Sequence, residues 1–308
     1  MPTIATEESS DIVVVMNESL SDLTTYLEGY ETSTDPMPYV RSLMKRGDVV
    51  SGTCAVSSDM GTGTANSEFE FLTGNSMAYF KGNTPYVQFI DTETPSLASL
   101  LAGHSTMAMH AYERAGYNRV KVYDRFGFEV YKGIEDFDVD LDYARGYPTD
   151  EANYRQLIKD FETVDEPTVV LFFGDHEPRL SNEFYSSWFT DENELDLETT
   201  AQLHKIPFFI WGNYNLNTES IQKGSVVSLN YLSTVLFQTA GVQLSPYQEY
   251  LADLRMEHPV ITARYFTTAF GNKVGTVSSA FTDSIREYQW LQYNCVFDRA
   301  HRIPGFYS

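Results

Sequence analysis

Four residues whose side chains hold metal ions or act as nucleophiles come where a predicted strand or helix begins or ends: Glu18, Thr64, Asp175 and His176. Two carboxylates and an imidazole form a mixed oxygen and nitrogen donor set, which suits manganese, zinc or magnesium. A hydroxyl beside such a cation ionises well below its aqueous pKa and becomes a nucleophile. The four residues together therefore predict metal-assisted attack by the Thr64 hydroxyl.

The segments that would position the acidic residues are two short, β-branched runs. Ile12 to Met16 ends at a polar cluster that contains Glu18, and Thr168 to Phe173 ends at Gly174 followed by Asp175 and His176. Both runs are typical of strands buried on both faces of a parallel sheet. Ligands bind beyond the carboxyl ends of strands in open α/β sheets, so these residues are placed for a site.

Thr64 follows a glycine-rich loop and precedes a predicted helix that includes residues 68–72. We expect Thr64 or Asn66 to cap this helix, because hydroxyl and amide side chains accept hydrogen bonds from the first free N–H groups. A helix N-terminus also favours an incoming phosphate. Alone, Thr64 is more often a simple cap, and an Asp-His pair often only closes a turn. Their joint occurrence with Glu18 favours a functional site.

Further patterns complete an α/β chain. The segments 106–112 and 206–211 are predicted strands, and 94–101, 150–162 and 228–241 are predicted to be helical. After Pro259 the sequence alternates and then predicts a late helix at 284–292. We therefore expect a mostly parallel central sheet flanked by helices in residues 1–255, and a small C-terminal antiparallel β subdomain in residues 256–308.

Composition limits the function classes. The chain has 308 residues, with 21 Lys and Arg against 43 Asp and Glu, which gives a formal net charge of −22. This charge repels nucleic acid, but an anionic substrate stays possible where a bound cation reverses the local field. The two cysteines are too few for a disulfide framework or a cysteine-rich zinc site. No apolar run is long enough to span a bilayer, and residues 1–11 lack the apolar core of a signal peptide.

Several motifs resemble the extracellular catalytic domain of lipoteichoic acid synthase-like phosphoglycerol transferases, in the sulfatase and alkaline phosphatase superfamily. The resemblance extends from Ile12 to about Leu251 and rests on matching segments in matching order: Met16–Ser19, Gly61–Phe69, His110, Tyr117–Arg119, Phe173–His176 and Pro207–Trp211. The segments around Thr64 and Asp175 are the most specific of these.

The resemblance implies one divalent metal ion, most readily manganese, held by residues that match Glu18, Thr64, Asp175 and His176. It implies that Thr64 attacks a phosphatidylglycerol-type headgroup and passes the glycerophosphoryl group to a hydroxyl of a polymer or glycolipid. It further implies that His110, Tyr117 and Arg119 bind the headgroup. Tyr117 stands where the family commonly has Trp. The implied location is the outer face of a bacterial cytoplasmic membrane, with the tether upstream of the chain.

One departure from the family pattern affects the function. A strand ending in an Asn-His-Gly-type motif, whose His contacts the substrate phosphate, normally precedes the strand that leads to Asp175, and this segment is missing near residues 162–164. Three alternatives therefore stay open: a phosphodiesterase or sulfatase-type hydrolase, a phosphoethanolamine transferase, and a catalytically impaired protein that binds glycerophosphate polymers. The cysteine or serine motif that typifies sulfatases is absent around Thr64.

Overall fold

The structure is a computed structural model that describes residues 10–27, 29–59, 61–80, 82, 84–101, 103–161, 166–181, 183–184, 196–276 and 281–307. A five-stranded sheet forms its centre, in the order β1-β7-β8-β2-β9. The strands are β1 (Asp11–Asn17), β2 (Val50–Ala55), β7 (Thr168–Gly174), β8 (Lys205–Gly212) and β9 (Val226–Ser228). Four of them run in one direction, since only β8 is antiparallel to its neighbours. The predicted α/β fold with a mostly parallel sheet is confirmed.

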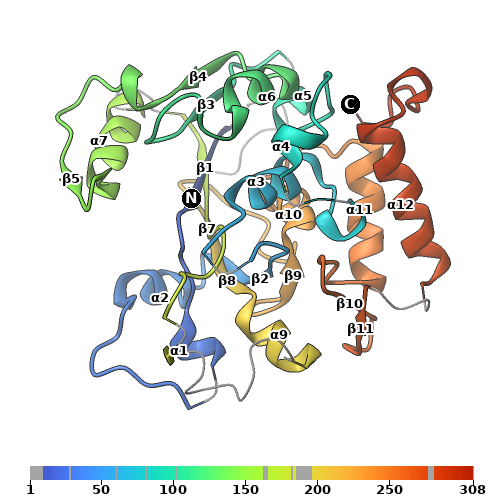
Figure 1. The fold of residues 1–308 in the computed structure, drawn as a ribbon, viewed down its shortest axis with the longest axis horizontal. Coiled ribbons are helices and arrows are strands. Elements are labelled where there is room, and N and C mark those ends of the chain that lie inside the picture. Colours follow the sequence, from blue (N-terminus) through green and yellow to red (C-terminus); the bar gives the residue numbers. More distant parts are fainter. Residues whose placement is uncertain are drawn as a thin grey trace.

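Helices cover the sheet on both faces (Figure 1). Those described are α1 (Leu23–Tyr26), α2 (Pro38–Met44), α3 (Thr64–Thr73), α4 (Pro85–Gln88), α5 (Leu97–Leu100), α6 (Arg119–Phe126), α7 (Asp150–Phe161), α9 (Leu197–Leu203), α10 (Leu232–Ala240), α11 (Pro246–Glu257) and α12 (Asp283–Val296). No helix within the described ranges has the length and apolar character needed to cross a membrane.

Short two-stranded sheets complete the fold: β3 (Met107–Met109) with β4 (Val130–Lys132), β5 (Tyr143–Ala144) with β6 (Tyr147–Pro148), and β10 (Tyr265–Thr267) with β11 (Lys273–Gly275). The last pair is antiparallel and is followed by α12, as the alternation after Pro259 predicted. The side chains of α12 share a core with α3 and α11, through contacts that include Phe69, Leu251 and Tyr288. The boundary between residues 255 and 256 stays a prediction.

The main core lies between the sheet and helices α3 and α10. Alternate residues of β7, beginning with Val169 and Leu171, are fully buried against this helical layer. Phe71 of α3 packs against Phe173 with ring centroids 5.0 Å apart. Burying a large apolar side chain contributes roughly 1.5–3 kcal/mol. This packing therefore fixes α3 against the end of β7, where Asp175 begins.

β1 departs from the prediction that it would be buried on both faces. It is the end strand of the sheet, and all seven of its residues are only half-buried. A β-branched run is typical of a central strand, but pattern alone does not tell a central strand from an edge strand that lines a cavity.

Candidate active site

The register of β1 and β7 brings two acidic strand ends together. Asn17 pairs with Gly174, so Glu18 and Asp175 are the first residues beyond two adjacent parallel strands. Ser19 then takes a left-handed conformation, with φ 55°, which is costly for a residue with a side chain. This turn directs the Ser19 N–H onto Asp175 Oδ1, at 2.7 Å. The local strain therefore serves to hold one candidate metal ligand.

Thr64 is the first residue of α3, and its hydroxyl faces both strand ends. Its Oγ1 lies 3.3 Å from Glu18 Oε2 and 3.4 Å from His176 Nε2. The capping prediction was wrong, because Gly63 takes the N-cap position with φ 94° and no side chain caps the helix. Glycine reaches this left-handed conformation without strain. The Thr64 hydroxyl is therefore available for chemistry instead of capping.

His176 presents one ring nitrogen to the acidic cluster. Its Nδ1 lies 3.0 Å from the backbone carbonyl of Glu177, which can only accept a hydrogen bond. Nδ1 therefore carries the proton of the neutral ring, and Nε2 keeps a free lone pair. Nε2 lies 3.0 Å from Asp175 Oδ2 and 3.4 Å from Glu18 Oε1. This orientation by a backbone carbonyl is typical of metal-binding histidines.

The acidic cluster fits a divalent cation. One ligand atom each from Glu18, Asp175 and His176 lies within 4.8 Å of the others. Asp175 and His176 are buried, and no hydrogen bond in the described part of the chain reaches Asp175 Oδ2. Burial and the nearby Glu18 carboxylate raise the pKa of Asp175 to about 6, and His176 opposes this shift. Two close carboxylates, one of them buried, favour a cation that offsets their charge.

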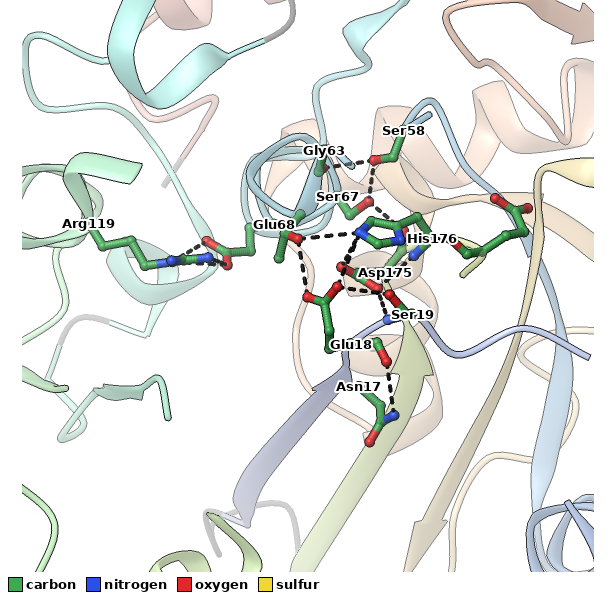
Figure 2. A network of polar contacts seen from close by, with 12 residues as sticks. Asn17, Glu18, Ser19, Ser58, Gly63, Ser67, Glu68, Arg119, Asp175 and His176 are labelled. Atoms are coloured by element: carbon green, nitrogen blue, oxygen red, sulfur yellow. Dashed lines mark hydrogen bonds and ion pairs between the residues drawn. The ribbon is translucent and has the colours of Figure 1, made fainter. Parts of the chain in front are cut away.

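A buried hydroxyl network joins α3 to the strand end that carries Asp175 (Figure 2). Ser67 Oγ donates to the backbone carbonyl of Asp175 at 2.6 Å and lies 2.7 Å from Ser58 Oγ. Ser58 in turn donates to the carbonyl of Gly63, the N-cap of α3. Both serines have no exposed surface. The network thus sets the distance between the Thr64 hydroxyl and the acidic cluster.

Arg119 lies apart from the acidic cluster, in a buried ion pair with Glu68 (Figure 2). Its Nε lies 3.1 and 3.2 Å from the two Glu68 oxygens, and its Nη2 lies 2.5 Å from Oε1. Tyr123 donates to Glu68 Oε2 at 2.9 Å. Arg119 is only 1% exposed. Its guanidinium is therefore committed to a protein carboxylate in this structure.

Tyr117 and His110 lie around this ion pair. The Arg119 guanidinium sits 5.1 Å from the centroid of the Tyr117 ring, and Tyr117 is 44% exposed. Tyr117 and Asn118 both have left-handed backbones, with φ 54° and 62°. Consecutive left-handed non-glycine residues store strain, which is a feature of functional sites. Burial, followed by the charge of Arg119, lowers the pKa of His110 to about 4, so its ring is neutral at pH 7.

Three residues that contribute to the geometry were missed by sequence reasoning: Ser19, Ser67 and Glu68. Glu68 lies one helical turn after Thr64 on the same face of α3, so the i, i+4 spacing was a usable signal. No sequence pattern predicted the left-handed turn at Ser19 or the carbonyl that Ser67 binds. The predicted loss of a family segment near residues 162–164 concerns a stretch outside the described residues, between the end of α7 and the start of β7, and it stays a prediction.

Comparison with protein families identifies a match to the sulfatase family over residues 10–155 and 147–242. The two matched stretches together span most of the chain, and they overlap at residues 147–155. Residues 147–155 thus match both the first and the second part of the family model. The overlap covers β6 and the first half of α7, and α7 ends close to the place where a family segment is predicted to be missing.

A curated relative from Rhizobium meliloti (strain 1021), described under cyclic β-1,2-glucan modification, is 23% identical over 373 residues. The match takes in 97% of this chain and 56% of the relative, so the chain spans about half the relative's length. Since 97% of 308 residues is about 299, about 74 of the 373 aligned positions have no counterpart here.

Solved structures share the fold. The Streptococcus pyogenes phosphoglycerol transferase GacH, in complex with sn-glycerol-1-phosphate, superposes with a TM-score of 0.72 at 15% identity, over 93% of this chain and 86% of GacH. The Listeria monocytogenes lipoteichoic acid synthase LtaP gives 0.57 at 15% identity, over 91% and 89% of the two chains. An alkaline phosphatase superfamily protein from Vibrio parahaemolyticus gives 0.60 at 13% identity, over 86% and 76%.

Proposed function

This chain belongs to the sulfatase family, and from that premise we propose that it is a metal-dependent phosphoglycerol transferase with Thr64 as its nucleophile. The observation that carries the proposal is the position of the Thr64 hydroxyl. It begins α3 and lies within 3.4 Å of both a carboxylate oxygen of Glu18 and the unprotonated nitrogen of His176. Gly63 takes the N-cap of α3, so the Thr64 hydroxyl, at the first helical position, is not used in capping.

Glu18, Thr64, Asp175 and His176 would hold one divalent ion, most readily manganese, which would lower the pKa of the hydroxyl and offset charge on the phosphate oxygens. The fit rests on the donor set, on the buried and unbonded Asp175 Oδ2, and on the ring orientation that Glu177 imposes on His176. Magnesium and zinc suit the same mixed oxygen and nitrogen set.

In the first step Thr64 Oγ1 forms a bond to phosphorus while the bond between phosphorus and the diacylglycerol oxygen breaks. Thr64 already donates toward Glu18 Oε2, which takes its proton, and the departing alkoxide takes a proton from solvent. The product on the protein is a glycerophospho-threonine. In the second step an acceptor hydroxyl attacks this phosphorus and gives its proton to solvent, while the bond between phosphorus and Thr64 Oγ1 breaks and Thr64 takes back the proton that Glu18 holds. Two inversions give retention at phosphorus.

The N-terminus of α3 would stabilise negative charge on the phosphate. Its first N–H groups have no side-chain cap, and the helix dipole places partial positive charge there. His110, Tyr117 and Arg119 would form the wall for the glycerol headgroup. Because Glu68 holds the Arg119 guanidinium, we propose that Arg119 acts by orienting Tyr117 and Glu68, and that the exposed Tyr117 ring touches the substrate.

For the acceptor we favour a sugar hydroxyl of a glucan or other polymer, because the curated relative is described under cyclic glucan modification. Water as the acceptor would make the protein a phosphodiesterase, and the first step would be the same. The donor is a lipid headgroup, so we propose that the reaction takes place at the outer face of a bacterial cytoplasmic membrane, through a tether outside this chain.

The test is release of diacylglycerol from phosphatidylglycerol vesicles with added manganese, for the wild-type chain, Thr64→Ala and Thr64→Ser. We expect release by the wild type, partial release by the serine variant and none by the alanine variant. Adding a glucan and following glycerophosphate on it separates transfer from hydrolysis. Equal release by wild type and Thr64→Ala would rule the proposal out.

A further inference from the structure

The loop that leads from β2 to Thr64, residues 56–63, is bound from outside by the segment that precedes β10. Arg264 Nη1 donates to the backbone carbonyl of Ser57 at 2.9 Å, and Arg264 Nη2 donates to the Asp59 carboxylate. One planar guanidinium thus binds a carbonyl and a carboxylate that are two residues apart. A lysine ammonium lacks this fixed fork of donors.

The backbone of the same segment also binds the loop. The Ala263 N–H donates to Ser57 Oγ at 3.0 Å, and Ser57 Oγ donates in turn to Glu70 Oε1 in α3 at 2.6 Å. Thr276, which follows β11, holds this segment in place: its hydroxyl donates to the Ala263 carbonyl at 2.7 Å and its N–H donates to the Arg264 carbonyl at 3.0 Å. The guanidinium therefore extends from a backbone that is itself fixed by hydrogen bonds.

On its other side the loop binds the strand end that carries two candidate metal ligands. The Gly61 N–H donates to the Glu177 carbonyl at 2.8 Å, and His176 Nδ1 donates to the same carbonyl at 3.0 Å. A Cβ on Gly61 would clash with the Arg179 side chain, so glycine is needed for this close approach. The position of the loop and the orientation of the His176 ring thus depend on one shared carbonyl.

Hydrogen bonds inside the loop connect the residues that Arg264 binds to the start of α3. The Thr62 N–H donates to the Asp59 carbonyl at 3.0 Å, and Ser58 Oγ donates to the Gly63 carbonyl at 2.9 Å. Gly63 directly precedes Thr64. A shift at Ser58 or Asp59 would therefore move the residue that carries the candidate nucleophile.

We propose that Arg264 is a positioning residue, which fixes the Thr64 hydroxyl relative to the candidate metal ligands. This inference rests on the proposed function, because it gives Arg264 a role in that reaction. The bond to the Ser57 carbonyl contributes more than the ion pair, since the Asp59 side chain is 70% exposed and exposed ion pairs contribute little. Residues after 255, predicted to form a separate subdomain, thereby take part in the candidate active site.

The first test compares Arg264→Met with Arg155→Met. Arg155 is the matched control, because it also donates to a carbonyl, that of Asp140 at 3.0 Å, and to a carboxylate two residues later, that of Asp142. We expect kcat for diacylglycerol release to fall by about tenfold or more in Arg264→Met, with KM changed by less than about twofold. Arg155→Met should keep the wild-type kcat, and Asp59→Asn should lose less than about threefold.

Hydrogen exchange followed by mass spectrometry gives a readout that needs no turnover. In Arg264→Met the peptide that carries the Gly61 and Thr62 amides should exchange about tenfold faster or more, while the rest of the chain keeps its protection. Unchanged exchange in this peptide would overturn the proposal, and so would faster exchange with an unchanged kcat. Faster exchange in Arg264→Met, when even the wild type releases no diacylglycerol, would support the role of Arg264 in fixing the loop and contradict the proposed function.

Arg264→Lys keeps the test decisive if Arg264→Met fails to fold. It retains the positive charge and most of the apolar stem, and loses the fork that binds Ser57 and Asp59 together. We expect exchange of the same peptide and kcat to lie between those of the wild type and a complete loss. Wild-type values of both quantities in Arg264→Lys would overturn the proposal.

Discussion

Ser67 Oγ donates a 2.6 Å hydrogen bond to the backbone carbonyl of Asp175, and this contact joins the helix that begins with Thr64 to the strand end that carries two candidate metal ligands. Thr64, the candidate nucleophile, and His176, one of these two candidate ligands, are 112 residues apart in the sequence. A single buried hydroxyl therefore bears directly on their separation, and small changes in that separation have large effects on rate.

Replacing Ser67 with alanine should lower kcat by about tenfold or more with a smaller change in KM. The variant removes a contact that fixes the position of Thr64, and Ser67 itself does not contact the substrate. It should also destabilise the fold by about 1–3 kcal/mol, since the Asp175 carbonyl loses a buried partner. Thr239→Val is the matched control, because Thr239 donates to the carbonyl of Val235 inside α10, away from the site. A similar stability loss with unchanged kcat is expected for it. Equal kcat losses in the two variants would argue against a positioning role.

Removing either buried ligand should abolish tight metal binding. We expect His176→Ala and Asp175→Asn each to weaken manganese affinity by about 100-fold or more, measured by isothermal titration calorimetry. Even the loss of a group that only hydrogen-bonds to a metal ligand costs about 10–100-fold in affinity. His301→Ala is the control, since the His301 side chain is 80% exposed. Unchanged affinity in His176→Ala would remove this residue from the ligand set.

The Glu68 and Arg119 pair should behave as a buried ion pair. Glu68→Gln should destabilise the fold by about 3–5 kcal/mol, because it leaves the guanidinium buried without a countercharge. In a cycle of the wild type, Glu68→Met, Arg119→Met and the double variant, the double variant should lose less than the sum of the two single methionine variants. Urea unfolding of all four proteins gives the coupling directly. Additive losses would mean that the pair contributes no coupling.

The chain should become less stable between about pH 4.5 and pH 7 because of Glu70. Burial raises the pKa of Glu70 to about 7 in the folded protein, from an ordinary value of 4.5. In this range the folded state binds more protons than the unfolded state, so the free energy of unfolding falls as pH rises, by up to about 3 kcal/mol. Above pH 7 this contribution is constant.

Glu70→Gln isolates that contribution, because the amide carries no charge and can still bind Ser57 and the Met77 N–H. The stability of the wild type relative to this variant should fall as pH rises from 5 to 7.5, in urea unfolding at matched ionic strength. A constant difference across that range would show that Glu70 does not titrate there.

Much of the candidate site could be predicted because its signals are local. A β-branched run that stops at a carboxylate, and a glycine-rich loop before a helix, identify Glu18, Asp175 and Thr64 without knowledge of the sheet. The α/β fold followed from the same runs. The order of the strands could not be predicted from these runs, because the edge position of β1 and the reversed direction of β8 depend on pairing between distant segments.

Predictions about single side chains failed where the role of a side chain depends on a residue that is distant in the sequence but close in the fold. Arg119 was expected to bind the substrate headgroup, and in the structure its guanidinium forms an ion pair with Glu68. The cap of α3 was assigned to a hydroxyl or amide, yet Gly63 takes that place because its backbone alone reaches a left-handed conformation freely. Both outcomes depend on what lies nearby in space.

The most direct test of the central claim is to incubate the manganese-loaded chain with phosphatidylglycerol in the absence of an acceptor, quench it with acid and map the modified peptide by mass spectrometry. We predict a glycerophosphoryl group on Thr64 in the wild-type chain, which disappears when a glucan acceptor is added, and no such group in Thr64→Ala. A group on another residue, or diacylglycerol release with Thr64→Ala, would contradict Thr64 as the nucleophile.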